Sequence, residues 1–226
     1  MSSEAGKEVA RLRDVFNHLP YDVITYGVLL NPDMSVSGCK IPGSKFANAG
    51  TLNKRMANQF AYSQSMMEKH PDLKEAYEAK LKFRAAFKGS STDIEKVKAA
   101  MESCDKLMDD METLLGKVKE KYGIPDSWLV GPRFSAADVT FTVLLHRLEL
   151  LGLEERFYPK NKRPHIYDYY QRLLERKSVQ QVISEEKKIM SLVIGSKLMK
   201  GLPYVAGIVV IGVAAVAAFT IMKRRT

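Results

Sequence analysis

The chain has 226 residues, of which 35 are Lys or Arg and 26 are Asp or Glu, so its formal net charge is +9. Hydrophobic residues make up 46% and charged residues 27%, a globular balance that excludes disorder over the whole chain. There are two Cys, and residues 1–14 lack the apolar core of a signal peptide, so we do not expect a disulfide framework. The Cys and His residues are scattered without metal-ligand spacing, and we predict no metal site.

Positive charge is concentrated in the middle of the chain. Residues 1–39 have a balance of −2 and residues 99–200 a balance of +2, whereas residues 40–98 hold 12 basic and 6 acidic side chains, a balance of +6. This middle segment has no nucleic-acid-binding motif, so we expect no nucleic-acid partner. Two interpretations stay open: a solvated helix face, or attraction to an anionic membrane surface or an acidic partner.

The first ninety residues predict four helices. Apolar residues recur at helical spacing over residues 9–19, where Pro20 ends the run, and a second apolar stretch covers residues 23–30. A Pro-, Gly- and Ser-rich loop then leads to two longer helical runs, residues 46–70 and 71–88. Pro71 suits the first position of the later helix, and Gly89-Ser90-Ser91 is expected to break it.

Residues 92–122 carry the most regular apolar pattern. Nine residues alternate steps of three and four, as the a and d positions of heptads do. They are Ile94, Val97, Met101, Cys104, Met108, Met111, Leu115, Val118 and Tyr122. This seam predicts either a coiled coil that dimerises the protein or one long helix of an intramolecular antiparallel bundle, with residues 71–88 as a ready partner. We favour the bundle.

The segment 130–152 predicts a helix in the centre of a core. Ser135 and Asp138 have the spacing of an N-terminal capping box, in which each side chain bonds the backbone amide of the other residue. Phe134 and Val139 occupy the two positions of a hydrophobic staple. The residues that follow are apolar nearly all round, as in a buried helix.

The remaining polar candidates favour structural roles, and we predict no catalytic residue and no cofactor-binding residue. Cys104 lies on the apolar seam, where an inert core thiol is expected, and Cys39 beside Lys40 is the better candidate for oxidation. His146-Arg147 is interpreted as a satisfied structural pair. Arg163-Pro164 most simply starts the next helix.

The C-terminal end predicts membrane attachment. Residues 201–222 form a 22-residue stretch without a charge, about 33 Å long as a helix and sufficient to cross a bilayer. Lys200 and the interfacial aromatic Tyr204 flank one end, and the basic tail, residues 223–226, flanks the other. The tail cations are Lys223, Arg224 and Arg225. A span so near the end predicts post-translational insertion, with residues 1–200 in the cytosol. Residues 179–200 predict an amphipathic juxtamembrane helix, either as the last helix of the domain running into the anchor or as a basic helix that lies on the membrane.

Four stretches carry a resemblance to a known family: LPYDVITYGVLLNPDMSVSGCKIP, HPDLKEAYEAK, FSAADVTFTVLLHRLELLG and KRPHIYDYYQRLLERKSV. The capped, buried helix is similar to the all-α C-terminal domain of the glutathione transferase superfamily. Within it, the chain most resembles the ganglioside-induced differentiation-associated protein 1 family, whose members carry a transmembrane tail. The resemblance implies a fold that is all-α: a glutathione-transferase C-terminal-like helical bundle over residues 1–178, with a long paired-helix extension and one C-terminal transmembrane helix.

The resemblance also implies a function. Its members are proteins of the mitochondrial outer membrane, and sometimes of peroxisomes, that influence mitochondrial fission. They begin with a thioredoxin-like domain that binds glutathione, and no pattern of that domain is found here. We therefore expect a non-catalytic role with protein partners of the fission or cytoskeletal machinery, and a homodimer is one further interpretation. The alternatives are a glutathione-transferase-like enzyme or subunit, and a tail-anchored adaptor of another organelle.

Overall fold

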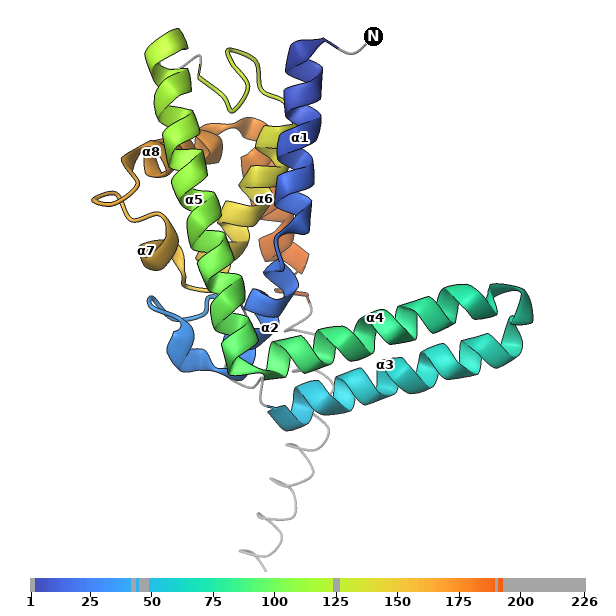
Figure 1. Cartoon of the computed structure of the whole chain (residues 1–226). Helices are drawn as coiled ribbons and strands as arrows, with labels where there is room; N and C mark the ends of the chain where they lie inside the picture. Colours follow the sequence, from blue (N-terminus) through green and yellow to red (C-terminus); the bar gives the residue numbers. More distant parts are fainter. Residues whose placement is uncertain (1–2, 42–43, 45–48, 124–126, 190, 193–226) are drawn as a thin grey trace, which may run out of the picture. The chain divides into compact units, whose positions relative to one another are not determined.

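The computed structural model describes residues 3–41, 44, 49–123, 127–189 and 191–192, and the fold of this part is helical (Figure 1). No β-strand occurs in these ranges, where the one β-type contact is an isolated bridge between Trp128 and Gly131. The prediction of an all-α fold is confirmed. The named helices are α1 (Glu4–His18), α2 (Tyr21–Leu30), α3 (Ala49–Lys69), α4 (Lys74–Thr92), α5 (Ile94–Tyr122), α6 (Ala136–Leu150), α7 (Glu154–Phe157) and α8 (Pro164–Glu175), with 3-10 turns at Pro32–Met34 and Pro71–Leu73.

Helix boundaries follow local signals in the sequence. Pro20 separates α1 from α2, as expected, and the Ser3 side chain accepts a hydrogen bond from the Gly6 amide at the start of α1. The Asp93 carboxylate accepts from the amides of Glu95 and Lys96 and so caps α5. At the other end of α5, Gly123 takes a positive φ of 75°, which an L side chain rarely adopts.

The predicted break at Gly89-Ser90-Ser91 is wrong, because α4 continues through these residues to Thr92. The hydroxyls of Ser91 and Thr92 both donate to the Lys88 carbonyl, so they bond within the helix instead of interrupting it. Ser91 is also buried, and its packing offsets the low helix propensity of the Gly-Ser-Ser run. The helix ends only where Asp93 begins to cap the next one.

The seam predicted over residues 92–122 lies in the core of the bundle. Seven of its nine residues are buried, from Val97 to Val118, whereas Ile94 and Tyr122 at the two ends are each 39% exposed. Helix α5 packs against α2, α4, α7 and α8, and α1 packs against α6. Because the chain's own helices cover the seam, the structure favours the intramolecular bundle over a dimerising coiled coil.

Helices α3 and α4 form an antiparallel hairpin that projects from the bundle, drawn in cyan and green in Figure 1. This hairpin is the paired-helix extension that the family resemblance implies. The expected partner of residues 92–122 is therefore corrected: α4 runs along α3 and contacts α2, and it meets α5 only near their shared end.

Two glycines mark places where the backbone of one element approaches another closely. A Cβ at Gly27 in α2 would lie 2.5 Å from the Cγ1 atom of Val97 in α5, so a larger residue at Gly27 would force these helices or the Val97 side chain to shift. Gly152, with a φ of +68°, follows α6 and contacts Gly38 of the loop after α2. The Gly152 carbonyl accepts from the amides of Val36 and Ser37 at 2.9 Å each, which fastens this loop to the end of α6.

The chain divides into two compact units, one of residues 1–176 and one beginning at Lys177. The second unit is helical over residues 177–189, and Val182, Ile189 and Leu192 are exposed on it. The predicted span 201–222 and its flanks Lys200, Tyr204, Lys223, Arg224 and Arg225 lie outside the described residues. Among the residues that the structure does describe, no helix combines the length and the apolar character needed to cross a membrane.

Candidate functional site

The start of α6 contains the capping box, and Asp138 is its centre. The Ser135 amide and hydroxyl both donate to Oδ2 of Asp138 at 2.7 Å. Its other carboxylate oxygen, Oδ1, accepts from the Leu129 amide at 2.9 Å and from the Tyr169 hydroxyl at 2.8 Å. Asp138 is fully buried, so this one carboxylate joins the loop before α6 to α8. Burial, and then the Asp138 charge, hold the pKa of Tyr169 well above its ordinary value, which keeps the phenol a donor.

The two staple positions have different surroundings. Val139 is 51% exposed and contributes little to the core. Phe134 is partly buried against the core, and its ring meets the Trp128 ring edge-on with centroids 5.1 Å apart. At the entry to α6, Phe134 thus packs on Trp128.

Arg163, directly before α8, is a buried cation held by α5. Its side chain is 1% exposed, its Nη2 atom lies 2.6 Å from Asp109 Oδ1, and its Nη1 atom lies 3.2 Å from Asp105 Oδ1. It also donates to the main-chain carbonyls of Asp105 and Phe157. Each of the three guanidinium nitrogens donates to at least one acceptor, as a buried charge requires. The expected role of Arg163-Pro164 in starting a helix agrees with this geometry.

A third acidic residue of α5, Glu112, caps the start of α8. Glu112 accepts hydrogen bonds from the backbone amides of His165 and Ile166, both at 2.9 Å. These amides have no partner within α8 because they belong to its first turn. The negative charge of Glu112 also complements the positive end of the helix dipole.

The C-terminal half of α6 carries a half-exposed cluster of titratable side chains. The Tyr170 hydroxyl donates to Oε2 of Glu149 at 2.6 Å, and Nδ1 of His146 lies 3.2 Å from that hydroxyl. Lys40, from the loop after α2, pairs with Glu154 at 2.7 Å and approaches Glu149 at 3.7 Å. The hydrogen bond with His146, followed by that from Tyr170, lowers the pKa of Glu149 to about 2 against the opposing effect of burial.

This cluster brings together groups that could serve in catalysis, but the polar contacts described for them are with one another. The Tyr170 hydroxyl is committed to Glu149, and burial raises the pKa of the phenol well above its ordinary value. Glu149 is held as a carboxylate, so it does not supply a proton near neutral pH. The arrangement fastens the loop that carries Lys40 to the end of α6, in agreement with the structural role expected for His146.

The two cysteines differ in burial. Cys104 is fully buried on the seam, and burial, with the neighbouring Asp105 charge, raises the pKa of its thiol to about 12. At neutral pH it is therefore a thiol, the unreactive form. Cys39 is partly buried, and its Sγ atom donates to the Leu150 carbonyl at 3.5 Å.

Sequence reasoning missed a cluster in which arginines stack on aromatic rings. Arg176 lies 3.8 Å from the centroid of the Phe134 ring and 5.1 Å from that of Trp128. Arg172 lies 5.2 Å from the Trp128 centroid, and its guanidinium donates to the Ser127 carbonyl at 2.9 Å. Arg172 lies in the last turn of α8 and Arg176, four residues later, follows the end of that helix; this spacing of two arginines was the available signal.

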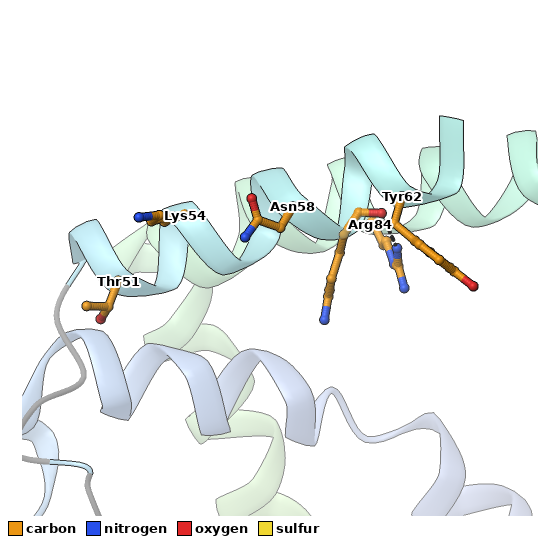
Figure 2. Close-up of a pocket in the computed structure, with 6 residues that line it drawn as sticks. Thr51, Lys54, Asn58, Tyr62 and Arg84 are labelled. Atoms are coloured by element: carbon orange, nitrogen blue, oxygen red, sulfur yellow. Dashed lines mark hydrogen bonds between the residues drawn. The ribbon is translucent and has the colours of Figure 1, made fainter. Parts of the chain in front are cut away.

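An open hollow lies along the α3–α4 hairpin, with a volume of about 490 Å³. Figure 2 shows how its side chains lie along the two helices. All of its lining residues are polar or aromatic, and Lys54 and Arg84 among them are cations. The full lining is Thr51, Lys54, Asn58, Gln59, Tyr62 and Arg84. The sequence marked the excess of positive charge over residues 40–98 but not this hollow, because the apolar spacing of two helices does not show which side chains line a space between them.

Metal-ligating side chains do not gather in the described part of the chain. Among the residues searched there, no group of three or more His, Cys, Asp or Glu side chains has the arrangement needed to hold an ion. Asp105 and Asp109 of α5 already share the Arg163 cation.

Comparison with known proteins agrees with this architecture. Residues 66–172 match the family model described as glutathione S-transferase, C-terminal domain. The chain is 29% identical over 189 residues to ganglioside-induced differentiation-associated protein 1-like 1 of Mus musculus, covering 80% of this chain and 50% of that protein. It is also 29% identical over 180 residues to the Homo sapiens protein of the same name, covering 78% of this chain and 48% of that protein.

A bacterial enzyme is similar over a shorter region. The chain is 28% identical over 111 residues to tetrachloro-p-hydroquinone reductive dehalogenase of Sphingobium chlorophenolicum, covering 49% of this chain and 40% of that enzyme. The chain spans about half the length of the curated relatives it matches. The helical bundle, its capped central helix and these similarities support assignment of the chain to the ganglioside-induced differentiation-associated protein 1 family, with a glutathione-transferase C-terminal-like domain.

Proposed function

We propose that this chain is anchored in the mitochondrial outer membrane by residues 201–222 and acts without catalysis in mitochondrial fission and network organisation. Its helical domain faces the cytosol and binds protein partners of the fission or cytoskeletal machinery. The observation that carries the proposal is a domain of this family followed by 22 uncharged residues between basic flanks. Such a stretch has the length and flanking charges of a membrane anchor.

The geometry of the bundle supports a non-catalytic role. The buried charged residues Asp138 and Arg163 are engaged by several partners within the chain, and Glu149 is held by Tyr170 and Lys40. Each of these contacts joins one helix or loop to another. Groups used in this way stabilise the bundle and are not poised to react with a substrate.

The test separates membrane attachment from the activity of the helical domain. We expect deletion of residues 201–226 to release the protein to the cytosol and to abolish its effect on mitochondrial length. Replacing Ile211, near the middle of the predicted span, with Arg should weaken insertion by about 2.5–3.5 kcal/mol. Location and network length are scored in the same cells. A released form that changes the network as strongly as the full chain would contradict the proposed mechanism.

Placement is scored against markers of three organelles. Peroxisomal membranes are a second site under the proposal. Full-length protein confined to the endoplasmic reticulum would instead favour an adaptor of that organelle.

A glutathione-dependent enzyme or enzyme subunit is the second candidate. It is favoured by the matched glutathione S-transferase domain and by the similarity to the reductive dehalogenase. Calorimetric titration of the full chain with glutathione decides between the two. Under the non-catalytic proposal we expect no heat of binding up to millimolar glutathione, and binding in that range would favour the enzyme.

A further inference from the structure

The hairpin stem, defined as residues 49–67 and 79–92, has an unusual distribution of charge. It contains no Asp or Glu, and the four acidic residues of the hairpin all lie near its turn, between residues 68 and 78. Cations of the stem therefore have no carboxylate within the stem to neutralise them. These cations are Lys54, Arg55, Lys80, Lys82, Arg84 and Lys88.

Two of these cations, Lys54 and Arg84, line the hollow of the hairpin. Its volume of about 490 Å³ is in the range of small-molecule sites, and no acidic side chain lines it. The amide side chains of Asn58 and Gln59 add hydrogen-bond donors, and the ring of Tyr62 is 63% exposed beside them (Figure 2). The lining thus combines positive charge, neutral donors and an aromatic ring.

Arg84 is held in position by the opposite helix. Its Nη1 atom donates to the Gln59 carbonyl at 3.0 Å and to the Ser63 hydroxyl at 2.9 Å. Ser63 is 1% exposed and donates in turn to the same Gln59 carbonyl at 3.0 Å. A guanidinium fixed in this way loses little conformational freedom when it binds an anion.

We propose that the hollow of the α3–α4 hairpin is a binding site for a phosphate ester, held by Lys54 and Arg84. A planar guanidinium matches the oxygens of a phosphate, and an ammonium adds a second positive charge. The absence of a lining carboxylate removes the repulsion that an anion would otherwise meet. The phosphate belongs either to a soluble molecule or to a lipid headgroup. None of the residues of this site belongs to the proposed anchor, so either proposal can fail alone.

The test is a calorimetric titration of the full chain in detergent micelles with two soluble probes. Inorganic pyrophosphate represents a soluble phosphate, and inositol trisphosphate represents a deacylated lipid headgroup. We expect at least one probe to bind and its affinity to fall as salt is raised. Inositol trisphosphate binding at least about tenfold tighter would assign the site to lipid headgroups, and the reverse order would assign it to soluble phosphates.

Variants separate the hollow from the general charge of the stem. Lys54→Gln alters an exposed side chain, and Arg84→Gln removes the fixed guanidinium; each should weaken binding at least about fivefold. Lys80→Gln removes the same charge from the stem outside the hollow and should change affinity less than about twofold. Absence of binding for both probes would overturn the site. An equal loss in Lys80→Gln and Lys54→Gln would also overturn it, because diffuse charge alone would then explain the binding.

Discussion

Among single residues, Asp138 departs most from an ordinary helix cap. A surface cap satisfies one or two amides at a helix start. Asp138 is buried and accepts from Ser135, Leu129 and Tyr169, so it also joins α6 to α8 and to the preceding loop. Capping and the packing of three segments therefore depend on the same carboxylate.

Removing this carboxylate should be costly. We expect Asp138→Ala to lower the free energy of unfolding by about 3 kcal/mol, since buried donors of Leu129 and Tyr169 lose their acceptor. Ser135→Ala should cost about 1 kcal/mol, the usual value for a cap. Urea denaturation of the full chain in micelles, followed by circular dichroism, measures both. Asp110→Asn, on the exposed face of α5, is the control and should leave the midpoint unchanged.

If Asp138→Ala and Ser135→Ala shifted the midpoint equally, Asp138 would act only as a cap. Its contacts with Leu129 and Tyr169 would then contribute nothing measurable to stability.

Glu149 predicts a dependence of stability on acidity. Its pKa is about 2 in the folded chain, below the value of 4.5 for an unperturbed Glu, because His146, Tyr170 and Lys40 favour the carboxylate. A lowered pKa means that its stabilisation is present above about pH 4.5 and is lost as the pH falls toward 2. The folded chain should therefore lose stability through this window.

The variant Glu149→Gln isolates this contribution. At pH 6 we expect it to be less stable than the wild type, and the difference should shrink steadily between pH 4.5 and pH 2. Denaturation midpoints at each pH provide the measurement, with Glu120→Gln on the exposed side of α5 as the control. A difference that stays constant through this window would show that the Glu149 carboxylate contributes no linked stability.

The helices themselves could largely be predicted from the sequence. Proline marked the start of α2 and α8 and the turn before α4, and apolar spacing marked the buried face of α5, because both signals act within a few residues. The continuation of α4 past Gly89 could not be predicted, since packing of the buried Ser91 overrides the local propensity.

Contacts between distant residues were the part that the sequence did not indicate. Arg163 meets Asp109 across 54 positions of the chain, and Arg84 meets Ser63 across 21. In the sequence, each of these is an ordinary charged or polar residue. Its partner becomes apparent only when the packing of the helices is known. The stacking of Arg172 and Arg176 on the rings of Trp128 and Phe134 was missed for the same reason.

The crossing of α2 and α5 gives a test of how tightly these elements pack. Gly27→Ala would place a methyl group against Val97, and we expect it to lower the free energy of unfolding by about 1–3 kcal/mol through overpacking. Adding Val97→Ala should recover part of this loss by making room. A double-mutant cycle on the denaturation free energies measures the coupling. Purely additive effects would mean that the two residues do not limit the crossing.

For the whole molecule, the charge outside the bundle bears on the proposed location. The last three charged residues, Lys223, Arg224 and Arg225, follow the predicted span directly. Replacing all three with Gln should leave the protein in a membrane but redirect it, and we expect the endoplasmic reticulum to receive it. Fluorescence microscopy against organelle markers gives the readout.

The matched control removes an equal charge from the helix over residues 177–189, through Lys177→Gln, Lys187→Gln and Lys188→Gln. This control should keep its mitochondrial placement. Equal redirection by both sets of substitutions would show that total charge, and not the tail, decides the destination.

The join between α4 and α5 has a mechanical consequence. A single residue, Asp93, separates the end of α4 from the start of α5, and its carboxylate is fixed to the first turn of α5. Helix α4 has 19 residues and so extends about 28 Å from that residue. By simple geometry, a rotation of about 10° at Asp93 would sweep the far turn of the hairpin through about 5 Å. A small change of backbone angle at this one-residue connection would therefore be amplified into a much larger displacement at the turn of the hairpin.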